Sequence, residues 1–220
     1  MNLASFIYRL LPVLLLAFLT ACPSKLPFDY SAFYNHRPRS ILVLPPLNLT
    51  TDVNAPYSYL STISNPLAEC GYYVFPVAVI DAYMKENGLP SSEEMHAVSL
   101  EKIKDIIGAD AVLYVTIEEW GQKYIVLQSI TTIKTSARLV DTASGEVIWH
   151  GTQSISQGSG GGHPLVMLIN AVVVQIVDSM TDFTHDLSRV ANQDMINNPN
   201  EGFLAGPYLV SKESEHCINR

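Results

Sequence analysis

Three short apolar runs, separated by segments with helical spacing, constrain the fold of this chain more than any other feature. They are Ser40–Leu44, Tyr72–Ile80 and Ala111–Trp120. Each is rich in β-branched, aliphatic or aromatic residues and predicts a strand, and the first lacks alternation, which indicates burial on both faces. Pro76 requires an edge, a bulge or a break in the second run. Because strands joined through helices pair in parallel by right-handed crossovers, these runs predict a parallel βαβαβ core.

The segments between the runs carry start and stop signals of helices. Tyr57–Cys70 has apolar residues at intervals of three and four and is followed by Gly71, which predicts an amphipathic helix and its end. Asp81–Asn87 is predicted to be a short helix. Ser91 opens a Ser-x-x-Glu capping box, and Ser99 precedes a further periodic segment, so both are predicted to be helix N-caps.

From Gly121 onward the pattern changes to long alternating stretches. Tyr124–Val140 contains neither glycine nor proline, and a single strand of that length would exceed ~50 Å at about 3.3 Å per residue, so we expect a bend or bulge in it. Asp141–Gly145 has turn chemistry, and Glu146–Ser156 predicts the returning strand. The expected fold is one α/β domain whose mixed sheet combines the parallel core with an antiparallel meander, flanked by helices.

A glycine-rich loop, Gln157–His163, precedes a long helical pattern from Leu165 to about Val190 that is apolar nearly all round as far as Val177. Such a helix is buried in the core, covers the surface of an oligomer partner, or associates with a membrane. All three interpretations stay open. In the second, the residues at the oligomer or partner interface are Leu165, Leu168, Ile169, Val172, Val173 and Ile176.

The N-terminus has the features of an export signal. Arg9 is followed by the apolar run Leu10–Leu19, whose length of about ten residues is roughly half of a bilayer crossing. The next residues complete Leu19-Thr20-Ala21-Cys22, which resembles the lipobox of bacterial lipoproteins. That resemblance implies cleavage before Cys22, acylation of its thiol and anchoring to a membrane. Pro23, in place of the aspartate of an inner-membrane retention signal, favours the outer membrane.

The chain is accordingly divided into four parts. Residues 1–21 are a signal peptide, 22–38 a lipidated tether with three prolines, 39–190 the α/β domain and 191–220 a C-terminal tail. The tail is polar and rich in asparagine. We expect it to pack on the domain or trail from it, with Phe203, Leu204 and Tyr208 as its contacts.

Charge and cysteines restrict the partners and the compartment. Loss of Arg9 with the leader leaves 12 of the 13 basic residues against 21 acidic ones, a formal charge of −9. An acidic chain of this kind is poorly suited to nucleic acid or anionic lipid. Once Cys22 is acylated, the mature chain retains two other cysteines, Cys70 and Cys217. An oxidising envelope permits one intramolecular disulfide between these two. The alternative is a buried thiol at Cys70 and a disordered Cys217.

The sequence contains no complete catalytic or metal-binding motif. The glycine-rich loop lacks the Gly-Lys-Ser/Thr of a phosphate-binding loop, and Ser99 with Lys102 lacks the companion motifs of acyl-transfer enzymes. We therefore predict no catalytic residue, cofactor or metal. The histidines show no metal-ligand spacing; they are His36, His96, His150, His163, His185 and His216.

Several blocks spread over most of the mature chain resemble those of a known family. They are Asp29–Phe33, Arg37–Asn48, Gly71–Val74, Pro76–Val79, Gly108–Ala111, Ser136–Asp141 and Gly206–Pro207. With them the chain resembles Gram-negative lipoproteins without an assigned function, a family that includes a neisserial vaccine-candidate surface lipoprotein. More distantly, the strand, turn and strand around Gly145 are similar to the periplasmic domains of the curli-secretion channel lipoprotein and of lipoprotein activators of peptidoglycan synthases. These relatives imply partner binding at the envelope.

The sequence thus predicts a non-enzymatic lipoprotein held at the outer membrane by acyl chains, with its domain in the periplasm or, alternatively, at the cell surface. Its expected role is that of an accessory in envelope assembly, export or transport. It would dock envelope proteins, and a second copy of itself through the apolar helix. The alternatives are a regulator of peptidoglycan synthesis and a hydrolase with an unconventional site.

Overall fold

The computed structural model describes residues 27–125, 128–158, 180–209 and 216–217. Helices and strands alternate in the first half, and three long strands follow. In chain order the elements are α2 (Ser31–His36), β1 (Ser40–Val43), β2 (Leu47–Asn48), α3 (Ala55–Glu69), β3 (Tyr73–Val74), α4 (Val77–Glu86), α5 (Ser92–His96), α6 (Leu100–Ile106), β4 (Ala111–Ile125), β5 (Gln128–Asp141), β6 (Val147–Gly158) and α8 (Met180–Ile196).

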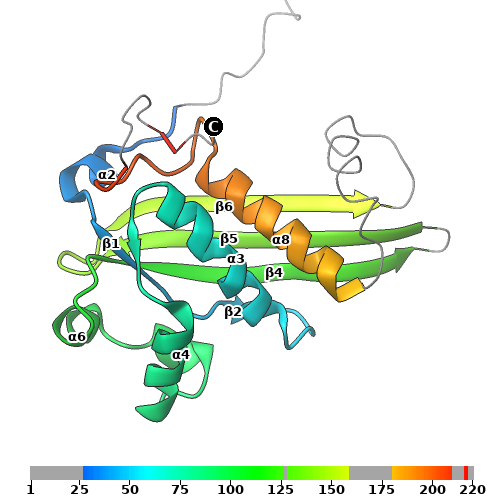
Figure 1. Ribbon diagram of the computed structural model, residues 1–220, viewed down its shortest axis with the longest axis horizontal. Coiled ribbons are helices and arrows are strands. Elements are labelled where there is room, and N and C mark those ends of the chain that lie inside the picture. Colours follow the sequence, from blue (N-terminus) through cyan, green and yellow to red (C-terminus); the bar gives the residue numbers. More distant parts are fainter. Residues whose placement is uncertain (1–26, 126–127, 159–179, 210–215, 218–220) are drawn as a thin grey trace, which may run out of the picture.

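The described strands form a mixed six-stranded sheet (Figure 1). Its order is β3-β1-β4-β5-β6, and the short β2 also pairs with β4. Strands β3, β1 and β2 run parallel to their neighbours, whereas β4, β5 and β6 are antiparallel. The predicted α/β class, with a parallel core extended by an antiparallel meander, is therefore confirmed.

The sheet separates two hydrophobic cores because successive residues of a strand point to opposite faces. On one face, Ile41 and Val43 of β1 pack with α3, the end of α8 and the tail. On the other face, Leu42 and Leu44 pack with α4, α5 and α6. All four side chains are at most 1% exposed, which agrees with the burial on both faces that the unbroken apolar run predicts.

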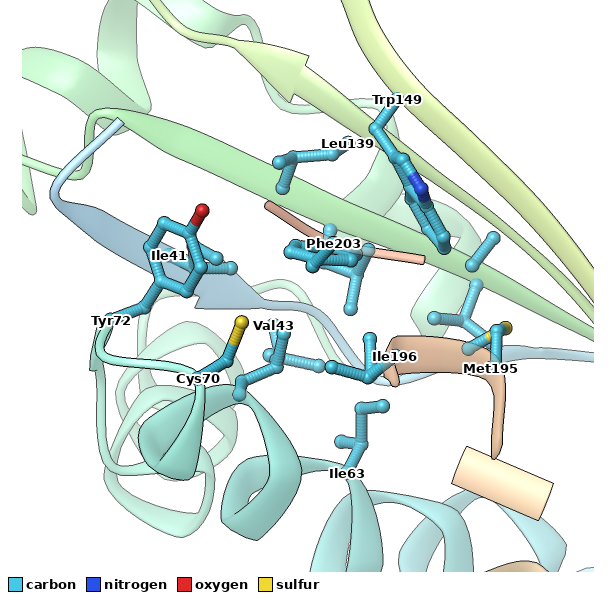
Figure 2. Packing of buried hydrophobic residues seen from close by; sticks show 14 of the residues in the cluster. Ile41, Val43, Ile63, Cys70, Tyr72, Leu139, Trp149, Met195, Ile196 and Phe203 are labelled. Atoms are coloured by element: carbon cyan, nitrogen blue, oxygen red, sulfur yellow. The ribbon is translucent and has the colours of Figure 1, made fainter. Parts of the chain in front are cut away.

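Phe203 lies near the centre of the first core (Figure 2). Its ring is 4.4 Å from that of Trp149 and 5.9 Å from those of Phe33 and Tyr72, measured between centroids. Complete burial of a phenylalanine stabilises a fold by roughly 2–3 kcal/mol. The tail residue Phe203 thus helps to build the core. Leu204 is buried beside it, whereas Tyr208 is 55% exposed.

The second apolar run is part strand and part helix. Strand β3 ends at Val74, and Pro76 is the N-cap of α4, which continues through the segment expected to be a separate short helix. A proline lacks the N–H that a strand ladder requires but is tolerated at a helix start. The break that Pro76 required is therefore a change of element. After the proline, Ile80 is buried in the second core, whereas Val79 is 63% exposed.

The long alternating segment is likewise divided. Residues Tyr124 and Ile125 end β4, and β5 begins at Gln128, so the two strands pair as a hairpin over nearly their whole length. The register of that pair shifts between Ile117 and Glu119. We expected an irregularity inside one overlong strand, whereas the segment contributes to two strands.

The helix signals are confirmed where the structure describes them. Ser91 accepts a hydrogen bond from the backbone N–H of Glu94, whose carboxylate accepts one from the backbone N–H of Ser91. Ser99 caps α6 by accepting from the N–H of Lys102. Helix α3 ends one residue before Cys70.

Two boundaries differ from the divisions expected from the sequence. Helix α2 lies within the expected tether, and its Phe33 is buried in the core. Helix α8 continues to Ile196, so the first residues of the expected tail belong to the domain. The prolines around α2 and the polar sequence after Val190 favour a tether and a tail. Phe33 holds the first segment to the domain, and Ala191, Met195 and Ile196 hold the second.

Several predicted features lie outside the described residues. Among them are the cleavage site and Cys22. Within the described ranges, no helix is long and apolar enough to cross a membrane. The expected oligomer or partner interface also lies outside them; its residues are Leu165, Leu168, Ile169, Val172, Val173 and Ile176.

His96, at the end of α5, attaches that helix to the sheet. Its Nε2–H donates to the carbonyl of Pro45 at 2.9 Å, and its ring lies 5.1 Å from that of Tyr114. Burial lowers the pKa of His96, and the nearby Arg138 acts in the same direction; Glu93 and the hydrogen bond to Pro45 oppose them. The folded state therefore favours the neutral imidazole.

This environment predicts a pH-dependent stability. As the pH falls below about 6.5, the unfolded chain protonates this histidine before the folded chain does, so the free energy of unfolding decreases until the lower folded pKa is passed. His96→Gln keeps a donor for Pro45 and removes the titration. Urea unfolding from pH 7.5 to 5 is expected to show a shallower pH dependence for this variant than for the wild type. Equal slopes would contradict the role assigned to His96.

Candidate functional site

An apolar groove lies between α4 on one side and α5 and α6 on the other. Its volume is about 590 Å³, which lies in the range of ligand and peptide pockets. Met84 and Ile103, both buried, form part of its lining. Tyr83 and Ile106 also line it and are 41% and 63% exposed. We call this surface the α4–α6 groove.

The helix caps create the groove. Helix α4 ends near Asn87, and Ser91 and Ser99 each start a new short helix. The chain therefore changes direction twice within about a dozen residues, and the short helices cover the sheet without closing on α4. Leu89 and Val98, which line the groove, come from the two connections.

Acidic residues predominate around the groove. The segment from Val77 to Ile107 contains six carboxylates and three lysines. Asp81 and Lys85 pair at 2.6 Å, and Lys85 also donates to the hydroxyl of Tyr57. Glu94 and Lys102 line the groove itself, and the other carboxylates give the segment an acidic balance that favours a partner with basic residues near its apolar side chain.

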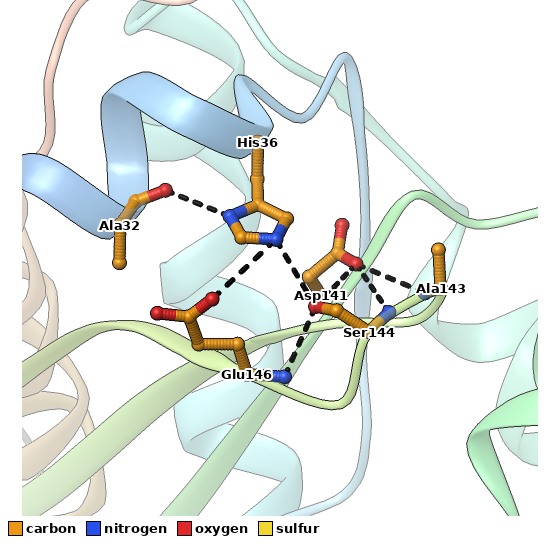
Figure 3. A network of polar contacts seen from close by, with 6 residues as sticks. All are labelled: Ala32, His36, Asp141, Ala143, Ser144 and Glu146. Carbon is orange, nitrogen blue, oxygen red and sulfur yellow. Dashed lines mark hydrogen bonds and ion pairs between the residues drawn. The ribbon is translucent and has the colours of Figure 1, made fainter.

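A polar network joins α2 to the turn between β5 and β6 (Figure 3). One carboxylate oxygen of Asp141 accepts from the N–H groups of Ala143 and Ser144 and from the hydroxyl of Ser144, at 2.8–3.0 Å. His36 places Nε2 3.1 Å from that hydroxyl, and its Nδ1–H donates to the carbonyl of Ala32. A histidine, a serine and an aspartate are thus close together.

This grouping differs from an acyl-transfer triad. In a triad the carboxylate orients the imidazole, which accepts the serine proton. Here Asp141 binds Ser144 and the turn, while a backbone carbonyl orients His36. Glu146 adds an ion pair with His36 at 3.6 Å when the imidazole is protonated. The arrangement closes the turn between β5 and β6 and attaches α2 to it. This explains why Asp141–Gly145 has the residues of a turn.

Cys70 and Cys217 lie side by side. Their sulfur atoms are in bonding contact and their Cα atoms are 5.1 Å apart, a separation that a disulfide spans. Next to them the backbones of two glycines pack together. The N–H of Gly206 donates to the carbonyl of Cys70, and a Cβ at Gly206 would collide with the backbone of Gly71. The tail is therefore attached beside the end of α3.

Other blocks of the family resemblance meet at the start of β1. The carboxylate of Asp110 accepts from the N–H groups of Arg39 and Ser40 at 2.9 and 3.1 Å. Ser40 in turn accepts from the N–H of Asp110, and Thr142 donates to the carbonyl of Ala109. These residues hold β1, β4 and the end of β5 together, so their role here is structural.

Metal chemistry finds no support in the described residues, where no group of three or more histidine, cysteine, aspartate or glutamate side chains could hold an ion. The groove was not predicted from the sequence. The sequence feature that could have indicated it is that α6 carries more apolar residues than one buried face requires. Ile103 alone is buried in that helix, whereas Ile106 is left for another contact.

The sequence of the chain matches a family of known proteins. The family model "Putative lipoprotein GNA1162-like" matches residues 28–208. "Putative lipoprotein NMB1124/NMB1162" of Neisseria meningitidis serogroup B is 43% identical over 200 residues, which cover 89% of this chain and 93% of that protein.

The chain is also similar to solved structures. The crystal structure of lipoprotein GNA1162 from Neisseria meningitidis is 47% identical, with a TM-score of 0.55, and the match covers 64% of this chain and all of that one. A PelC dodecamer structure from Paraburkholderia phytofirmans is 17% identical, with a TM-score of 0.44, over 76% of this chain and 90% of that one. The family model and the 43% identical relative both extend over most of the chain. This chain is therefore a member of the GNA1162-like lipoprotein family.

Proposed function

We propose that this protein is a non-enzymatic adaptor, anchored by Cys22 to the outer membrane, that docks a periplasmic envelope protein in the α4–α6 groove. The observation that carries the proposal is the groove itself, whose lining is largely apolar and includes Tyr83 and Ile106, 41% and 63% exposed. Apolar surface of this kind is typical of interaction sites.

The position of the groove fits an anchored protein. Helix α2 starts at Ser31 and is fixed to the core through Phe33, so the sequence between Cys22 and α2 spans at most about 30 Å when fully extended. In Figure 1 the start of the described chain and α4 lie on opposite sides of the molecule. An anchor at Cys22 therefore leaves the groove accessible from the side remote from the tether.

The chemistry of the groove specifies the partner. Its apolar lining would accept one or two aliphatic or aromatic side chains, and the surrounding carboxylates favour a basic rim on the partner. We propose that this partner belongs to the envelope assembly, export or transport machinery, because an outer-membrane anchor would place the domain beside it. Capture of a peptidoglycan synthase would instead identify the chain as a regulator of that enzyme.

Photo-crosslinking in intact cells tests the proposal. A photoreactive phenylalanine replaces Tyr83 at the groove or, as a control, Glu69 at the exposed end of α3. One discrete adduct with an envelope protein is expected from position 83 and not from position 69. Adding Ile106→Glu should remove the adduct, because a carboxylate would be desolvated against the apolar lining. Identical adducts from both positions, or an adduct insensitive to Ile106→Glu, would contradict docking in the groove.

A further inference from the structure

The two edges of the sheet are protected to very different degrees. Strand β3 forms one edge, has two residues and is followed closely by Pro76. Strand β6 forms the other edge and has 12 residues, from Val147 to Gly158, with no proline and no Asp, Glu, Lys or Arg. Edge strands normally carry prolines or charges that prevent pairing with another chain. The β6 edge lacks these devices and has one neighbouring strand, β5, within the described part of the chain.

The sequence of β6 is self-complementary in the antiparallel direction. Residues 153–157 read Gln-Ser-Ile-Ser-Gln, a palindrome centred on Ile155. If two copies pair around a twofold axis at Ile155, each Gln153 faces a Gln157, each Ser154 faces a Ser156, and Ile155 faces its own copy. Amides and hydroxyls both donate and accept hydrogen bonds, so these like pairs do not repel. A twofold interface requires such self-complementarity.

The burial of the strand agrees with this pairing. Thr152, Ser154 and Ser156 are exposed on one face, whereas Ile155 faces α8 and is only partly buried against a small cluster that includes Ile133 and Leu187. A second copy would bring its own Ile155 to this cluster and extend it across the axis. Mature copies, each with a formal charge of −9, repel one another. The uncharged β6 edge is a place where they can approach.

We propose that two copies of the protein pair β6 with β6 in antiparallel orientation, forming a continuous sheet across a twofold axis at Ile155. This interface is separate from the α4–α6 groove, and it uses described residues of the sheet. Pairing at an edge supplies a ladder of main-chain hydrogen bonds, and side-chain complementarity fixes the register.

Disulfide trapping in the lipidated full-length protein in cells tests the register. Opposed residues of an antiparallel pair have Cα atoms about 4.5–5.5 Å apart, which a disulfide spans. Ile155→Cys is therefore expected to give a covalent dimer on mild oxidation. Thr152→Cys is the control on the same strand, since its two copies would be offset by six residues, about 20 Å. Equal dimer from both positions would overturn the proposal.

Charge swaps at the exposed serines supply a second test. Adding Ser154→Lys and Ser156→Lys to Ile155→Cys places like charges opposite each other twice and should reduce the trapped dimer about tenfold. Ser154→Lys with Ser156→Glu should restore it. Equal yields from the two pairs would overturn the proposal. Co-expressed copies carrying Ser154→Cys and Ser156→Cys separately should form the mixed dimer, and its absence would also overturn the proposal even if Ile155→Cys perturbs the fold.

Discussion

Cys217→Ser is expected to lower the free energy of unfolding by about 2–5 kcal/mol, because a disulfide that closes a loop of this length strongly restricts the unfolded chain. The two cysteines are separated by 147 residues in sequence, and both are buried. The bond would tie the C-terminal tail to the end of α3. Urea unfolding under non-reducing conditions measures the change.

The controls separate loss of the bond from loss of a buried side chain. Cys70→Ser and the double variant should be destabilised about as much as Cys217→Ser, since each removes the same bond. Reduction of the wild type should give a similar decrease. Two reactive thiols in the denatured, unreduced mature protein, in addition to an acylated Cys22, would contradict the bond.

Cys22→Ala is expected to abolish membrane association of the protein. Each acyl chain contributes ~0.8 kcal/mol per buried methylene group, so several chains hold a protein at the membrane almost irreversibly. The remaining sequence has an acidic balance, which gives little attraction to anionic lipids. Fractionation of cells should therefore recover the wild type with the outer membrane and the variant in the soluble or uncleaved precursor fraction.

A matched variant controls for effects of the substitution on export. Ser24→Ala changes a residue two positions after Cys22 and leaves the lipobox and the other two cysteines intact, so it should remain with the membrane. Processed Cys22→Ala protein that still sediments with the outer membrane would contradict the anchor and would assign membrane binding to the domain.

The parts of the fold that could be predicted are those fixed by local rules. The apolar run before Leu44 has no alternation and is buried on both faces, and Ser91 and Ser99 cap helices because their side chains reach the next turn. β-branched residues such as Val77 and Val79 favour a strand locally over Tyr72–Ile80. The structure instead starts a helix after Pro76, and burial of Ile80 and Met84 against the sheet stabilises it, so tertiary contacts override propensity.

Phe203 and Leu204 are buried, as expected of tail residues that contact the domain, whereas the burial of Phe33 and the exposure of Tyr208 could not be predicted from the sequence. Phe33 and Phe203 sit in segments without periodicity, and they are buried because the two ends of the domain meet over the same face of the sheet. That contact depends on the complete topology. Tyr208 has the same local character as Phe203 and is exposed.

The candidate site shows the same limit. The groove arises where α4 and α6 fail to meet, and their relative position is set by the two caps and the sheet beneath. The helical spacing of α6 includes Ile106 among its apolar positions, but it does not indicate that this side chain stays exposed to solvent. The contact between Cys70 and Cys217 agrees with the one intramolecular disulfide that the sequence permits, although the sequence left a buried thiol at Cys70 as the alternative.

Mass analysis of the mature protein purified from membranes tests the central claim most directly. The account predicts a chain that begins at Cys22 and carries acyl chains on that residue. An unmodified cysteine at position 22, or an N-terminus elsewhere, would contradict it.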